Sequence, residues 1–177
     1  KKDKKITPVG IGGASFNHGY TGKSIDDEAI VAIERAAELG FGYLDTSPSY
    51  GESERRIGLA FKNNSKLRDK FFLATKTGTG PEPEGATSDR HGADWTYRSV
   101  ERNLKRMNTD YIDLIQIHDT EDLEPWLVKG AALSALVDLK EQGVIGGIGL
   151  GLRSHKLLLR AIEHGDFDTI LTYFRKK

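Results

Sequence analysis

Four residues whose side chains can exchange protons or hold charge lie at or just beyond short apolar stretches of the sequence. Asp45 and Tyr50 lie in YLDTSPSYG, Lys76 comes directly after FFLAT, and His118 comes after DLIQI. A tyrosine phenol has a pKa of about 10, too high for easy proton exchange at neutral pH. A neighbouring ammonium lowers that pKa, and a carboxylate can hold the ammonium in place. Because a histidine beside the phenol can orient a carbonyl oxygen, the set is suited to acid–base chemistry on a ketone or an alcohol.

Each of these residues also has an ordinary structural explanation. Asp45 could cap a turn, and Tyr50 could pack against a neighbouring element. Lys76 could be a solvated surface residue, and His118 could be a structural histidine held by hydrogen bonds. The catalytic interpretation is favoured because all four occupy equivalent points of the chain, near the carboxyl ends of apolar stretches.

A metal site is the alternative for His118. Asp119 and Asp45 could supply further ligands, which would indicate metal-assisted hydrolysis. The other histidines considered, which are scattered along the chain, do not provide a second imidazole at ligand spacing; they are His91, His155 and His164. We therefore expect no metal ion.

Short apolar stretches alternate with segments that have the spacing of amphipathic helices. Ile30, Ile33 and Ala37 form one such apolar face, for example, and Gly40 follows it. Strands that alternate with helices predict βαβ units and a parallel sheet. Five main helices are expected between six strands, which are Val9–Ala14, Gly42–Thr46, Phe71–Thr75, Tyr111–His118, Val144–Leu150 and Phe167–Tyr173.

Two architectures fit this alternation, an open doubly wound sheet and a (βα)8 TIM barrel. The first predicts the phosphate-binding pattern G-x-G-x-x-G after the first strand. Gly10–Gly13 and Gly147–Gly151 are rich in glycine, but neither has that spacing. We therefore predict the α/β class with the first six βα units of a barrel. The carboxyl ends of barrel strands share one rim, where chemistry occurs, and the four residues would meet there.

One segment, Lys76–Asp94, has no apolar periodicity and reads KTGTGPEPEGATSDRHGAD. It is long for a connection between a strand and a helix, and such loops are usually functional or mobile. We expect an adaptable loop that takes part in substrate recognition.

Length and composition narrow the class of protein. A chain of 177 residues suffices for a single domain, residues 1–177, and is short for two. With 26 basic and 26 acidic residues, nothing indicates a nucleic-acid partner. There is no cysteine, no secretory signal and no apolar run of membrane length, so a cytoplasmic protein without a membrane partner is expected.

Four segments that together span most of the chain carry a resemblance to a known family. They read GYLDTSPSYGESERRIGLAF, LATKTG, RSVERNLKRMNTDYIDLIQIHD and LKEQGVIGGIGLG. In order and spacing they resemble the aldo-keto reductases, above all the branch of sugar (aldose) dehydrogenases related to galactose and fucose dehydrogenases. The resemblance implies an NAD(P)-dependent oxidoreductase that acts on an aldehyde, a ketone or a sugar.

The resemblance also implies a role for each of the four residues. Tyr50 would donate or accept the proton, while Asp45 and Lys76 would set its pKa. His118 would orient the substrate. The implied cofactor is NADP or NAD, with NADP slightly favoured.

Cofactor contacts are implied for Asp45, Gly151 and Arg153. Arg153 is a departure, because relatives usually have an asparagine there that holds the nicotinamide carboxamide. Phe174 similarly replaces a polar residue often found at the end of the sixth strand.

The family has eight strands, whereas six are predicted here. We therefore expect this chain to be part of such a barrel. By itself it should bind cofactor weakly, show negligible turnover and self-associate through open sheet edges. The alternative is a truncated, non-catalytic relative that serves as an interaction subunit.

Overall fold

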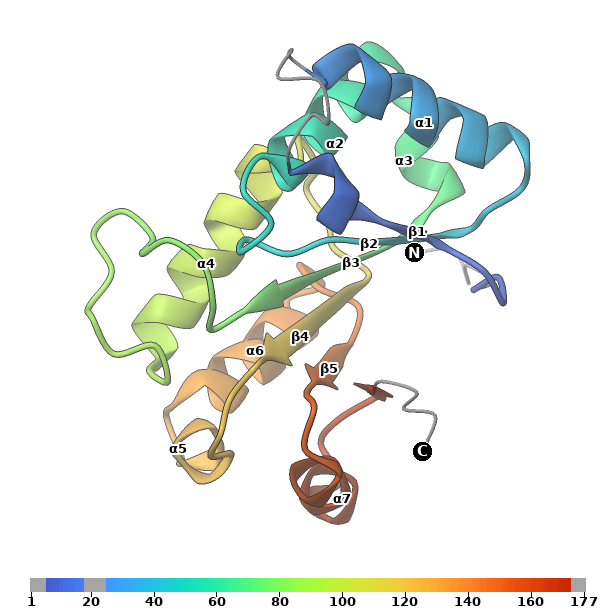
Figure 1. Cartoon of the computed structure of the whole chain (residues 1–177). Coiled ribbons are helices and arrows are strands. Elements are labelled where there is room, and N and C mark those ends of the chain that lie inside the picture. Colours follow the sequence, from blue (N-terminus) through green and yellow to red (C-terminus); the bar gives the residue numbers. More distant parts are fainter. Residues whose placement is uncertain (1–5, 18–24, 173–177) are drawn as a thin grey trace.

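Six parallel strands form one curved sheet, in the order in which they occur along the chain. The computed structural model describes residues 6–17 and 25–172. The strands are β1 (Ile11–Gly12), β2 (Tyr43–Asp45), β3 (Phe72–Thr77), β4 (Leu114–His118), β5 (Ile148–Gly151) and β6 (Thr169–Leu171). Because the strand order never reverses, the sheet curls as part of a (βα)8 barrel, as predicted, and not as a doubly wound sheet (Figure 1).

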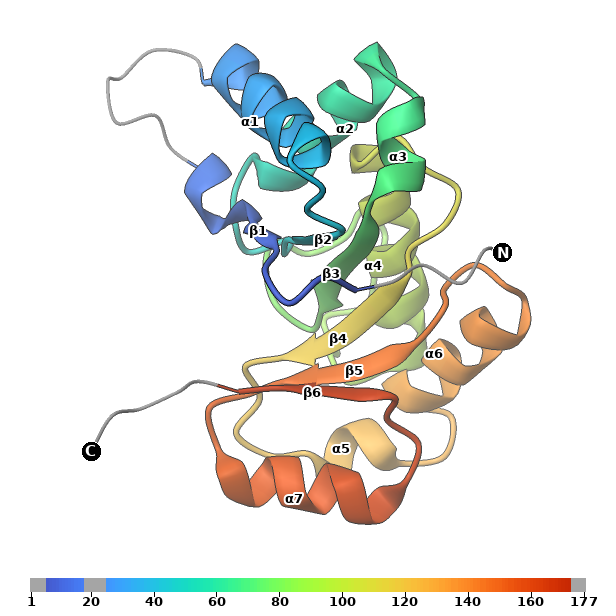
Figure 2. The same cartoon turned by 90° about the vertical axis from the view of Figure 1, so that its right-hand side faces the viewer.

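Helices cover the outer, convex side of this sheet. They are α1 (Asp26–Glu38), α2 (Ser53–Asn63), α3 (Lys66–Lys70), α4 (Ala93–Arg106), α5 (Glu124–Leu127), α6 (Ala132–Glu141) and α7 (His155–His164). Figure 2 shows α1, α2 and α3 near one end of the sheet, α5 and α7 near the other, and α4 behind its middle. Within the described residues, no helix combines the length and the apolar character needed to cross a membrane.

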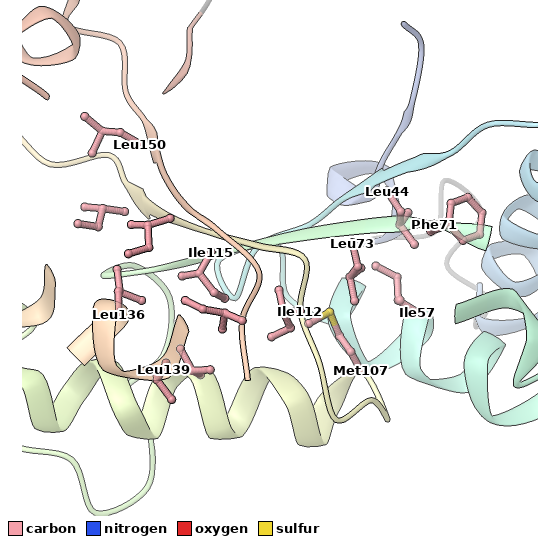
Figure 3. Close-up of a cluster of buried hydrophobic side chains, with 14 of the residues drawn as sticks. Leu44, Ile57, Phe71, Leu73, Met107, Ile112, Ile115, Leu136, Leu139 and Leu150 are labelled. Atoms are coloured by element: carbon pink, nitrogen blue, oxygen red, sulfur yellow. The ribbon is translucent and has the colours of Figure 1, made fainter. Parts of the chain in front are cut away.

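The hydrophobic core lies between the sheet and these helices (Figure 3). Alternate residues of each strand point to it, as in Leu73 of β3 and Ile115 of β4, both fully buried. Leu136 and Met107 meet them from the helix side. The intervening strand residues therefore face the concave side, and this side contains the polar residues Lys76, Gln116 and His118.

The first and last strands are shorter than predicted. The first, predicted as Val9–Ala14, ends at Gly12 because the chain then turns into a 3₁₀ helix, η1 (Gly13–Phe16). That helix packs so closely on β2 that a Cβ at Gly13 would lie 2.9 Å from the carbonyl oxygen of Asp45. The last, predicted as Phe167–Tyr173, is Thr169–Leu171, and both Tyr173 and Phe174 lie outside the described residues.

The middle strands also differ in their bounds. β3 was predicted as Phe71–Thr75 but continues to Thr77, so Lys76 lies within the strand rather than after it. β4 and β5 begin later than predicted, at Leu114 and Ile148, because the preceding residues are joined only by an isolated bridge between Ile112 and Ile145. The short helices α3 and α5 were not predicted; with five and four residues they are too short to show helical periodicity.

Helices α2 and α4 cross at Gly58, which is buried. A Cβ at this position would overlap the carbonyl oxygen of Arg106, the last residue of α4. Glycine therefore sets how closely these two helices approach.

We expect Gly58→Ala to lower the free energy of unfolding by about 1–3 kcal/mol, because the added methyl group must push α2 away from α4. Urea unfolding measures this change. The matched control is Gly12→Ala, since nothing lies within 4 Å of a Cβ at Gly12 and its backbone φ is −96°. Equal stability of the two variants would show that the crossing does not need glycine.

Candidate active site

A buried ion pair between Lys76 and Asp45 lies on the concave side of the sheet. The Lys76 ammonium donates to both carboxylate oxygens of Asp45, at 2.7 and 2.6 Å, and to the carbonyl oxygen of Thr46 at 2.6 Å. The side chain of Lys76 is 1% exposed and that of Asp45 is 18% exposed. An ammonium has three N–H donors, so these three acceptors match its full donor capacity.

Burial and pairing act on this pair in opposite directions. Burial lowers the pKa of Lys76 and raises the pKa of Asp45, whereas the charge and hydrogen bonds of each partner oppose that change. Three acceptors around one nitrogen favour the ammonium over a neutral amine, which would turn a lone pair toward one of them. The pair is thus a fixed positive charge held by a fixed negative one.

Residues on the helix side hold the backbone of this pair in position. The side-chain amide of Asn103 on α4 donates to the carbonyl oxygen of Lys76 at 2.9 Å. The hydroxyls of Thr46 and Ser53 lie 2.8 Å apart and join the end of β2 to the start of α2. Because Asn103, Thr46 and Ser53 are all fully buried, these bonds are shielded from water.

A second buried acid, Glu54, lies behind the pair on the first turn of α2. It is fully buried, accepts a hydrogen bond from the Thr75 hydroxyl at 2.9 Å, and lies 3.4 Å from the guanidinium of Arg106. Burial raises the pKa of Glu54, and its charge in turn favours the charged form of Lys76. The ammonium therefore has a carboxylate partner in front of the sheet and a second acidic group behind it.

Tyr50 and His118 lie together beside the ammonium. Their rings meet edge to face, with centroids 6.3 Å apart at 88°, and the Lys76 nitrogen is 5.1 Å from the centroid of the Tyr50 ring. Tyr50 reaches this place because the chain turns after β2, where the Tyr50 amide donates to the Ser47 carbonyl oxygen at 3.0 Å. The structure therefore brings together all four residues proposed from the sequence.

A cavity of about 190 Å³ opens at this point. Its lining combines three of the four residues with part of β4 to β6: Tyr50, Lys76, His118, Asp119, Gly151, Leu152, Leu171 and Thr172. Asp45 is not among the described residues that line the cavity. It is connected to the cavity through its ion pair with Lys76. A small molecule in the cavity would lie against Tyr50, Lys76 and His118 at once.

The imidazole of His118 is held in its neutral form. Burial is the largest cause, with the positive charges of Lys76 and Arg153 adding to it, and together they lower the pKa of His118 to about 4 against the opposing charge of Asp119. At neutral pH the ring therefore has one N–H donor and one acceptor nitrogen.

Two glycines of β5 leave room for the side chains of β4. In register, Gly149 lies beside Gln116, and Gly151 lies beside His118. A Cβ at Gly149 would lie 3.0 Å from the Gln116 side chain, and one at Gly151 would lie 3.1 Å from its amide oxygen. Gly151 thus leaves bare backbone at the cavity wall, the place proposed for cofactor contact.

Arg153 lies outside the cavity, at a neighbouring hollow of about 540 Å³. Its side chain is 67% exposed, and its guanidinium is 3.8 Å from the carboxylate of Asp119, which lines both spaces. The remaining lining of the hollow, which is mostly polar, consists of Thr120, Glu121, Ser154 and Leu157. Of the three proposed cofactor contacts, Gly151 therefore lines the cavity, Arg153 lines the neighbouring hollow, and Asp45 lines neither.

The metal alternative lacks a ligand set in this region. In the described parts of the chain, no three side chains of the His, Cys, Asp or Glu type come together as metal ligands would. The Nε2 atom of His118 lies 3.7 Å from a carboxylate oxygen of Asp119, and in the part of the chain that the structure describes no third such residue joins them.

Three buried or half-buried residues near the site were missed in the sequence. Asn103 could have been found, because Ser99 and Asn103 put two polar residues four apart on the inner face of a helix, where apolar residues are expected. Gln116 is two residues before His118 on the same strand and so shares its face. Thr79, whose hydroxyl lies 2.9 Å from the Nδ1 atom of His118, had no signal because it lies in the irregular loop.

The chain is similar in sequence to proteins of a known family. The model of the Aldo/keto reductase family matches residues 8–173. The chain is 33% identical to the D-threo-aldose 1-dehydrogenase of a Pseudomonas species, over 94% of this chain and 56% of that protein. It is 37% identical to the D-arabinose 1-dehydrogenase of Saccharomyces cerevisiae, over 95% and 52%. The chain thus spans about half the length of the curated relatives it matches.

A solved structure shares the fold. The holo form of an aldo-keto reductase from Bacillus halodurans superposes with a TM-score of 0.77, over 96% of this chain and 54% of that one. At 23% sequence identity, this likeness concerns the fold alone.

The low pKa of His118 predicts a pH dependence of stability. The pKa is about 4 in the folded chain and about 6.5 for an unperturbed histidine, so the unfolded chain binds more protons between these values. This residue therefore makes the free energy of unfolding fall as the pH drops from about 6.5 to about 4. We expect a smaller fall in His118→Gln than in the wild type, measured by urea unfolding at intervals across this range. Parallel curves for the two proteins would contradict the neutral, buried imidazole.

Proposed function

This chain belongs to the aldo/keto reductase family, and from that premise we propose that it is an NAD(P)-dependent oxidoreductase that interconverts a carbonyl compound and an alcohol. The observation that carries the proposal is the convergence of Tyr50, Lys76 and His118 on one small cavity, with Asp45 paired to the ammonium behind it. None of the three would be expected in contact with a common space if each were only structural.

Tyr50 is the proposed proton donor for reduction and the proton acceptor for oxidation. The ammonium of Lys76, 5.1 Å from the Tyr50 ring centroid, stabilises the phenolate that remains when the proton leaves. Since the three donors of this ammonium are held by Asp45 and Thr46, it acts on the phenol through its field and not as a second proton donor. Water has little access to this charge, so the interaction is stronger than it would be at the surface.

His118 is the proposed orienting group. As a neutral imidazole it can donate one hydrogen bond to a carbonyl oxygen without competing as an acid. Its ring meets that of Tyr50 edge to face, so one substrate oxygen in the cavity could be reached from both. This arrangement would place the oxygen between the proton donor and the orienting donor.

The residues around the cavity suit the nicotinamide end of a dinucleotide. Gly151, with Leu152 and Leu171 beside it, offers bare backbone and apolar side chains, and a Cβ at position 151 would narrow the space there. Arg153 and Ser154, at the neighbouring hollow, could hold polar groups at its edge. When bound, NADP or NAD supplies or accepts the hydride.

The proposed substrates are aldehydes, ketones and, above all, sugars. The names of two relatives, D-threo-aldose 1-dehydrogenase and D-arabinose 1-dehydrogenase, indicate sugar oxidation in those proteins. In this chain, the hollow beside the cavity has hydroxyl, carboxylate and guanidinium groups that can bind sugar hydroxyls, among them Asp119, Thr120 and Arg153.

In a complete barrel that contains these residues, we expect Tyr50→Phe to lower kcat by about 10²–10⁴-fold, because the variant keeps the ring and loses the proton. The affinity for NADPH or NADH should stay nearly unchanged, since the hydroxyl is not proposed to hold the cofactor. Turnover with sugar and aldehyde substrates measures kcat, and quenching of tryptophan fluorescence measures the cofactor affinity.

Tyr97→Phe is the matched control, because its hydroxyl bonds Asp138 on the outer side of the helices. It should keep wild-type turnover. Cofactor binding without turnover in the wild type would favour the non-catalytic alternative. Equal turnover of Tyr50→Phe and wild type would overturn the assignment of Tyr50.

A further inference from the structure

The irregular loop after β3 reaches the active site through one side chain. The hydroxyl oxygen of Thr79 lies 2.9 Å from the Nδ1 atom of His118, within hydrogen-bond distance. Thr79 is half-buried and does not line the cavity, so it contacts the imidazole from behind. This contact connects the loop directly to the proposed orienting group.

The backbone on both sides of Thr79 is fixed by close packing. Gly78 and Gly80 have φ values of +87° and +93°, which side chains other than glycine rarely adopt. A Cβ at Gly78 would overlap the indole of Trp126, and one at Gly80 would lie 2.8 Å from the backbone of Pro48. Gly78 packs on Trp126 and Gly80 packs on Pro48, and both of these neighbours are buried. The close contacts of the two glycines therefore fix the backbone on each side of Thr79.

Trp126 is itself held in place. It is 2% exposed, its indole N–H donates to the Thr120 hydroxyl at 3.0 Å, and the His91 ring packs edge to face on it at 4.9 Å. The position of the Thr79 hydroxyl therefore depends on packed side chains and not on the loop alone.

The direction of the hydrogen bond follows from the other nitrogen of the ring. A carboxylate oxygen of Asp119 lies 3.7 Å from the Nε2 atom of His118. A negative charge at this distance favours a proton on Nε2 and disfavours a lone pair there. With the single proton of the neutral ring on Nε2, Nδ1 is an acceptor and the Thr79 hydroxyl must be the donor.

We propose that Thr79 is a positioning residue that donates to Nδ1 of His118 and thereby keeps the imidazole proton on Nε2. Thr79 does not touch the substrate. It acts through His118, whose Nε2–H is the group that binds the carbonyl oxygen. The expected effect of Thr79 on turnover rests on the proposed function. The position of the proton on the His118 ring does not depend on it.

Nitrogen NMR of the imidazole tests the proposal without any turnover. The chemical shifts of Nδ1 and Nε2 distinguish the two neutral forms of the ring, and the His118 signals are identified by their loss in His118→Asn. We expect the Nε2–H form to predominate in the wild type. In Thr79→Val, which keeps the shape and removes the hydroxyl, the ratio of Nε2–H to Nδ1–H should fall by about 2- to 10-fold, as expected for the loss of one hydrogen bond. Thr79→Ser should restore it.

Thr87→Val is the matched control, because Thr87 lies in the same loop and its side chain is exposed. It should leave the ratio unchanged. A predominant Nδ1–H form in the wild type, or equal ratios in the wild type and Thr79→Val, would overturn the proposal.

Steady-state kinetics then separates this proposal from the proposed function. We expect Thr79→Val to lower kcat by about 3- to 10-fold with little change in KM for the cofactor, and Thr79→Ser to recover most of the loss. An absence of turnover in a complete barrel that contains these residues would overturn the proposed function and leave the NMR result standing. A normal kcat in Thr79→Val despite a changed ratio would overturn the catalytic part of the proposal.

Discussion

The buried ammonium of Lys76 is the constraint on which the rest of the site depends. A charge removed from water is tolerated only when it is paired and hydrogen-bonded, and an incomplete set of partners would cost several kcal/mol. Here the three acceptors come from the end of β2, because both Asp45 and the Thr46 carbonyl lie there. The register of β2 and β3 is therefore fixed by chemistry at the rim as well as by the apolar residues between sheet and helices.

The site is open to the concave side and supported from the convex side. Asn103 holds the backbone of Lys76, and Glu54 adds a second acidic group near the ammonium through the hydrogen bond with Thr75. Both residues lie on helices that cross at Gly58, so the helix layer that forms the core also positions the polar groups behind the sheet. The packing of α2 against α4 therefore also determines where Asn103 and Glu54 lie relative to Lys76.

Much of the fold and the four central residues could be predicted from the sequence, for a physical reason. The alternation of apolar stretches and helix faces indicated a parallel sheet, and the carboxyl ends of parallel strands share one rim. Asp45, Lys76 and His118 therefore had to meet, whatever the lengths of the loops. Tyr50 was less certain, because its place depends on the turn after β2.

The rest depended on contacts that a single sequence does not reveal. The early end of β1 follows from the close packing of Gly13 on β2. The position of Thr79 depends on Trp126 and Pro48, which are distant in sequence and pack on its two neighbouring glycines. Helices as short as α5 have no period to detect. The exposed position of Arg153, outside the cavity, could not be read from its place after β5.

The three hydrogen bonds of Lys76 also decide what this residue does not do. A lysine in contact with aldehydes can act as a nucleophile and condense with them to an imine, but only through the lone pair of a neutral amine. The ammonium held by Asp45 and Thr46 has no lone pair to offer, and it is 1% exposed. The site is proposed to bind reactive carbonyl compounds. Because Lys76 stays an ammonium, it can supply a positive charge there without being modified covalently by these compounds.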